Sequence, residues 1–98
     1  MRSLFFLTVL AVSSNVFAQQ TETIARVMSS DVMFAAPVVD LNAKHKCQPL
    51  KGDTVAVLAV QKNADGLIGA NMANVRVVSG LCAGTTGWIG VEQLQAVR

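Results

Sequence analysis

The sequence is poor in the residue types on which most active sites and aromatic binding surfaces depend. Its 98 residues contain no tyrosine, one tryptophan, one histidine and two cysteines. One histidine and two thiols do not supply the four nitrogen and sulfur ligands of a typical zinc site, so we expect no metal site and no cofactor. The net charge of +2 gives no basic surface of the kind that binds nucleic acid, and we expect no nucleic-acid partner.

Residues 1–18 have the pattern of a secretory signal peptide. Arg2 supplies a positive start, residues 4–12 form an apolar run, and Ala18 stands at the end of a small or apolar segment that a signal peptidase would read. A retained membrane anchor is the less favoured alternative, because a spanning helix needs about 20 apolar residues. We expect cleavage after Ala18, a periplasmic or secreted protein, and no membrane insertion after cleavage.

Removal of the signal peptide would leave one small domain with a modest core. We expect residues 19–24 to form a flexible N-terminus and residues 25–98 to form the folded domain. Phe34 and Trp88 are then the remaining aromatic residues. We expect Phe34 to lie in the core, whereas Trp88 is open to two interpretations, as a packing residue or as a face for a ligand.

Cys47 and Cys82 are the two cysteines, and an exported chain meets an oxidising compartment. Two cysteines allow one intramolecular pairing. Free or intermolecular thiols are the alternative, and a Cys47–His45 catalytic pair is a remote one. We predict the disulfide Cys47–Cys82, which would stabilise a domain of this size by about 4 kcal/mol through closure of the intervening loop.

Short β-type segments separated by turn residues make up the rest of the chain, and no segment after the signal has a sustained helical period. The strongest strand lies at residues 54–60, where an unbroken apolar run predicts that both faces are covered. Residues 74–78 alternate, with Val75 and Val77 on one face and Arg76 on the other. Weaker strands are expected at residues 26–28, 31–35, 88–89 and 95–97, and a long polar loop at residues 40–49. This pattern predicts an all-β fold.

Two blocks of sequence resemble bacterial SH3-like (SH3b) domains. Residues 51–58, Lys-Gly-Asp-Thr-Val-Ala-Val-Leu, are similar to one strand of that family, and residues 87–94, Gly-Trp-Ile-Gly-Val-Glu-Gln-Leu, are similar to its ending. The resemblance implies a small five-stranded SH3-like barrel with one short helical turn, at about residues 91–94, before the last strand. It also implies a non-enzymatic, extracytoplasmic binding or assembly role.

The ending departs from that of eukaryotic SH3 domains, which read proline-rich peptides on an aromatic groove. Gly90 stands where those domains have proline, and Gln93 stands where they have tyrosine. With two aromatic residues after the signal, the chain is not expected to build an aromatic platform. Polyproline recognition is therefore not predicted.

The candidate binding residues are Trp88, Glu92 and Gln93 from the ending, with Lys44 and His45 from the polar loop. The two basic residues would meet an anionic group by charge, and a solvated loop is the plainer interpretation. No spacing pairs two carboxylates as acid and base, so we predict that the protein is not an enzyme.

The predicted function is that of a non-catalytic extracytoplasmic SH3-like binding module that recognises a protein or a cell-wall (peptidoglycan) peptide in the cell envelope. This prediction follows from the resemblance together with the lack of a catalytic set. Two alternatives stay open. One is a structural subunit of an envelope assembly, in which an edge strand pairs with another chain. The other is an inhibitor or immunity protein that blocks an envelope enzyme.

Overall fold

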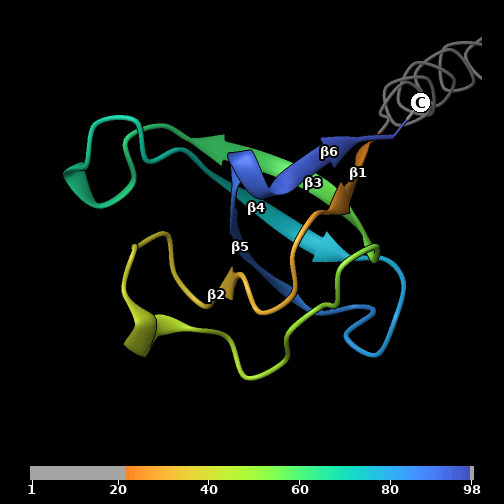
Figure 1. Cartoon of the computed structure of the whole chain (residues 1–98). Helices are drawn as coiled ribbons and strands as arrows, with labels where there is room; N and C mark the ends of the chain where they lie inside the picture. Colours follow the sequence, from red (N-terminus) through yellow and green to blue (C-terminus); the bar gives the residue numbers. More distant parts are fainter. Residues whose placement is uncertain (1–21, 98) are drawn as a thin grey trace, which may run out of the picture.

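The computed structural model describes residues 22–97, and the predicted signal peptide of residues 1–18 lies outside them. The described chain is all-β and forms one antiparallel sheet in the order β2-β5-β4-β3-β1-β6 (Figure 1). Its strands are β1 (Thr23–Val27), β2 (Met33–Phe34), β3 (Thr54–Gln61), β4 (Met72–Val77), β5 (Thr86–Gly90) and β6 (Leu94–Ala96). Three single-turn 3-10 helices lie between them: η1 (Leu41–Ala43), η2 (Ala64–Gly66) and η3 (Val91–Gln93).

The sheet has six strands, one more than the resemblance to SH3-like domains implies, and its two edges do not pair with each other among the described residues. The additional strand is β2. The sequence predicted a longer strand at this place, over residues 31–35. The strand does not begin at Asp31, because the φ of 64° at this residue places it in the left-handed region and outside the extended conformation. The short helical turn predicted before the last strand is confirmed as η3.

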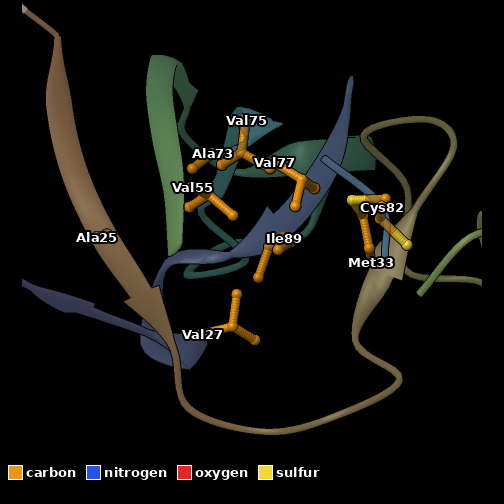
Figure 2. Close-up of a cluster of buried hydrophobic side chains, with 9 residues drawn as sticks. All are labelled: Ala25, Val27, Met33, Val55, Ala73, Val75, Val77, Cys82 and Ile89. Atoms are coloured by element: carbon orange, nitrogen blue, oxygen red, sulfur yellow. The ribbon is translucent and has the colours of Figure 1, made fainter. Parts of the chain in front are cut away.

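The core lies on one face of the sheet and consists mainly of short aliphatic side chains (Figure 2). The alternation predicted for β4 is confirmed: Val75 and Val77 are buried, and Arg76 is on the other face. Nine buried residues make up this cluster: Ala25, Val27, Met33, Val55, Ala73, Val75, Val77, Cys82 and Ile89.

The prediction that Phe34 belongs to the core is wrong. Within the two-residue strand β2, Met33 points inward and is fully buried, so Phe34 lies on the opposite face and is half-buried. Gly87 on β5 is what lets β2 approach so closely. A Cβ atom at Gly87 would lie 2.7 Å from Met33 Sδ and 3.0 Å from the Phe34 carbonyl oxygen.

Strand β3 is covered along only half of its length. Val55 and Ala56 are fully buried, whereas Leu58 and Val60 are 44% and 54% exposed. β1 pairs with Thr54–Val57 and reaches no further among the described residues. A β-bulge between Val57 and Ala59 also interrupts the pairing of β3 with β4. The predicted cover on both faces therefore holds for the first half of the strand and is wrong for the second.

The outer face of the sheet carries an ion pair that crosses β3. Arg76 Nη2 lies 2.6 Å from Glu22 Oε1, and Arg76 Nη1 donates to Glu22 Oε2 over 3.0 Å. Ala56 is in register with both Ile24 and Arg76, so it lies beneath this pair, and it is fully buried. The hydrogen bond from Arg76 holds the pKa of the Glu22 carboxyl below its ordinary value.

The predicted disulfide is confirmed. Cys47 and Cys82 are bonded, with their Cα atoms 5.9 Å apart. The bridge ties the loop that precedes β3 to the turn between β4 and β5, and Cys82 is a member of the core. A disulfide indicates an oxidising, extracytoplasmic environment. No helix within residues 22–97 is long and apolar enough to cross a membrane.

Candidate functional site

Three segments far apart in sequence meet around one groove with a volume of about 310 Å³. The first segment is the loop around β2, the second is the start of β4, and the third is the junction of β5 and η3. In Figure 1 the loop that carries η1 and the loop that carries η2 both project from the same side of the sheet. The lining residues are Asp31, Val32, Phe34, Val39, Leu41, Lys44, Ala70, Asn71, Met72, Gly90, Glu92 and Gln93.

The inner part of the groove is apolar. Met72 is almost fully buried and lies on the outer face of β4, the face opposite the core, while Phe34 contributes the only aromatic ring of the lining. Val39 and Leu41 line it from the loop and are 54% and 78% exposed. Large aliphatic side chains with so much surface in water gain most when a ligand covers them.

Charged groups lie among these apolar residues. Lys44 Nζ donates to the Asp31 backbone oxygen over 2.7 Å and to Asp31 Oδ2 over 2.8 Å. Both bonds are made to Asp31, whose backbone is left-handed, so Lys44 ties together two parts of the loop around β2. Among residues 22–97 no cation forms an ion pair with Glu92. The lining thus has one paired cation and two carboxylates, which favours a ligand with a positive group.

Backbone hydrogen bonds fix the other two segments. The Val91 N–H donates to the Asn71 carbonyl oxygen over 2.9 Å, which joins η3 to the start of β4. The Met28 N–H donates to the Gln93 carbonyl oxygen over 2.8 Å and joins η3 to the end of β1. The position of η3, and with it of Glu92 and Gln93, is therefore set by two neighbouring strands.

The structure brings three of the five predicted binding residues together. Lys44, Glu92 and Gln93 all line the groove. Trp88 is not among the lining residues, but it lies directly opposite Phe34 in the register of β2 and β5, and cross-strand partners share one face of a sheet. His45 does not line the groove either. Its Nδ1 accepts a hydrogen bond from the Cys47 N–H over 3.0 Å, so this imidazole is part of the fold of its loop.

Sequence reasoning missed the apolar lining. Val39 and Leu41 gave a weak signal, because they are large aliphatic residues at the start of an otherwise polar loop. Met72 gave none, since its side chain points to the opposite face from the core residues of β4. The register that places Phe34 beside Trp88 was also unforeseen, because the two residues are far apart in the sequence.

The polar part of the lining includes two carboxylates, Asp31 and Glu92, and one amine, Lys44. The lining has no cysteine, histidine, serine or threonine, the residue types that most often serve as nucleophile or base. Within the described part of the chain, no three His, Cys, Asp or Glu side chains are grouped so that they could hold a metal ion. A scan against protein-family models and searches of curated proteins and of solved structures each return no match.

Proposed function

We propose that the protein is a non-catalytic, extracytoplasmic SH3-like binding module whose groove takes an extended peptide from an envelope protein or from the cell wall. One observation carries the proposal. Lys44, Glu92 and Gln93, chosen from the sequence for their chemistry, line the same groove as five large apolar residues. A volume of about 310 Å³ lies at the lower end of the range for ligand pockets, about 300–1,000 Å³.

The order of the elements supports the SH3-like part of the proposal. A long loop with a minimal strand follows β1, a hairpin joins β3 to β4, and a single 3-10 turn separates β5 from the last strand. We propose that this six-stranded sheet is a partly open form of an SH3-like barrel, with β2 as an added strand. Export under the signal peptide of residues 1–18 completes the proposal, and the disulfide is consistent with the compartment.

The ligand chemistry follows from the lining. An aliphatic side chain would cover Val39 and Leu41, and a neighbouring basic group would approach Glu92. A surface charge of this kind contributes mainly to orientation and to the rate of association. We therefore propose a peptide that carries an aliphatic residue beside a lysine, an arginine or a free amine, as in the stem peptides of peptidoglycan.

The test is a titration of the oxidised, isotope-labelled protein with two probe sets, purified muropeptides and synthetic peptides with an aliphatic residue beside lysine or arginine. We expect shifts of the Asn71, Met72 and Glu92 amide signals, which belong to the groove. Leu41→Lys should weaken binding about tenfold, since a lost apolar contact of about 1.4 kcal/mol gives that factor.

Leu81→Lys is the matched control. Both leucines are largely exposed, Leu41 at 78% and Leu81 at 95%, and the substitution adds the same charge. Leu81 lies in the turn between β4 and β5, outside the groove. If neither probe set moves the groove signals, or if the two leucine variants weaken binding equally, the proposal fails. A Trp88→Ala variant then distinguishes the two interpretations of Trp88. If affinity falls and stability does not, Trp88 contacts the ligand. If stability falls and affinity does not, Trp88 is a packing residue.

A second function, that of a structural subunit in an envelope assembly, is supported by the second half of β3. Residues 58–61 are exposed and uncharged, and no strand among residues 22–97 pairs with them on the side of β1. An extended, uncharged strand edge is a template for pairing with another chain. Analytical ultracentrifugation over a range of concentrations tests this function, and a Val60→Lys variant that associates as the wild type does would speak against it.

A further inference from the structure

One wall of the groove depends on an unusually short strand. Asp31, Val32, Phe34, Val39, Leu41 and Lys44 all belong to the chain between β1 and β3, and β2 is the only strand within that chain. β2 has two residues, and it lies at the edge of the sheet with β5 as its one strand neighbour. Two ladder positions are a weak anchor for so long a loop, so the wall needs further support.

The side chain of Gln48 supplies part of that support. Its Oε1 accepts from the Met33 N–H over 2.9 Å, and its Nε2 donates to the Met33 carbonyl oxygen over 2.7 Å. The same Nε2 donates to the His45 carbonyl oxygen over 2.8 Å. The amide of Gln48 therefore makes with Met33 the pair of bonds that a neighbouring strand would make.

The backbone next to Gln48 completes the arrangement. The His45 N–H donates to the Met33 carbonyl oxygen over 3.0 Å, and Lys44 forms an isolated β-bridge with Phe34. The segment 44–48 thus lies along the free edge of β2 in place of a strand. Within this segment the covalent anchor is Cys47, which is bonded to Cys82 in the core.

We propose that Gln48 is the positioning residue of this wall and that the Cys47–Cys82 disulfide holds it there, so that the binding capacity of the groove depends on the redox state of the protein. The part of the proposal that concerns ligand binding rests on the function proposed above. Reduction needs a dithiol: the S–S bond breaks, both sulfurs become thiols, and the dithiol is oxidised to its own disulfide. Segment 44–48 then loses its covalent anchor, and the wall loosens.

The first experiment needs no ligand and measures hydrogen exchange of single amides in the oxidised and the dithiol-reduced protein. The Met33 and His45 amides report on the wall, and the Val77 amide, which donates to the Thr85 carbonyl oxygen over 2.8 Å, reports on the core sheet. On reduction we expect Met33 and His45 to lose nearly all of their protection, whereas Val77 in the core sheet stays measurably protected. Unchanged protection at Met33 and His45, or an equal loss at all three amides, would overturn the proposal.

Gln48→Glu tests the side chain without touching the disulfide. The carboxylate can still accept from the Met33 N–H, but it cannot donate to the carbonyl oxygens of Met33 and His45. Gln61→Glu adds the same charge at an exposed end of β3 and is the control. Faster exchange at Met33 and His45 in the first variant alone supports the positioning role, and equal exchange in the two variants refutes it.

Binding of the muropeptide and peptide probes is then compared across the oxidised, reduced and Gln48→Glu proteins. We expect affinity to fall about tenfold or more in the last two, with the groove signals of Asn71 and Met72 as the readout. If the wall loosens but no probe binds even to the oxidised protein, the proposed function has failed and the positioning role stands. If probes bind equally to all three proteins, the redox dependence is refuted and the binding function stands.

Discussion

Replacement of both cysteines by alanine should lower the free energy of unfolding more than any other small change in the chain. The bridge joins residues 35 positions apart, and a loop of that length loses conformational entropy worth about 4 kcal/mol when it is closed in the unfolded chain. Loss of the Cys82 sulfur from the core adds about 1 kcal/mol. The sum of about 5 kcal/mol is a large share of the 5–15 kcal/mol that stabilise a typical domain.

Urea denaturation at low temperature, monitored by the fluorescence of Trp88, measures this loss of unfolding free energy. We also expect the slope of the free energy against urea to rise in the double variant, because an unfolded chain without the bridge exposes more surface. On heating, the midpoint should fall by roughly 20–40 °C, since each kcal/mol moves a small domain by about 4–8 °C. The dithiol-reduced wild type is the control and should match the double variant to within about 1 kcal/mol. A loss below about 1 kcal/mol in both proteins would refute the entropic argument.

Two further predictions follow from the packing of β2 and from the outer face of the sheet. Gly87→Ala should cost about 1–3 kcal/mol and shift the Met33 and Phe34 amide signals, because the added methyl group meets Met33 Sδ and the Phe34 carbonyl oxygen; unchanged stability in urea would contradict the close approach of β2 to β5. The Glu22 carboxyl has a depressed pKa because Arg76 hydrogen-bonds to it, so its stabilising effect is present above its ordinary pKa and is lost as the pH falls through the lowered value. Thermal melts at about pH 7 and about pH 3 should therefore differ less for Glu22→Gln than for the wild type, and an equal difference would show that this pair does not contribute.

The sequence predicts a strand well where buried and exposed residues alternate along it. β4 shows this, because the alternation of Val75, Arg76 and Val77 survives unchanged in the structure. β3 shows the limit. Its apolar run predicts a strand, and the strand exists, but the run cannot reveal that β1 covers only its first half. Whether a strand is covered depends on how far the neighbouring strand extends along it. The sequence of one strand does not specify the length of another.

The candidate site likewise has residues that the sequence predicts and residues that it does not. Lys44, Glu92 and Gln93 were recognisable because their types and their place beside a known kind of ending suggested contact with a ligand. Gln48 was not recognisable, since a glutamine in a polar loop has no pattern that marks it as the partner of a strand. Its role depends on Met33 coming within hydrogen-bonding distance, and that proximity exists only in the folded chain.

The bulge at Leu58 bears on how the protein behaves when it is concentrated. Beyond it, Ala59–Gln61 form an extended, uncharged ribbon that is held in place by β4 on one side. An exposed, uncharged strand edge of this kind can pair with copies of itself and start aggregation. Bulges increase local twist and bend a strand, and a strongly twisted ribbon stacks poorly on copies of itself. We therefore expect the extra residue in β3 to protect the protein from precipitation, and a chain that lacks Leu58 to form fibrils at concentrations at which the wild type stays in solution.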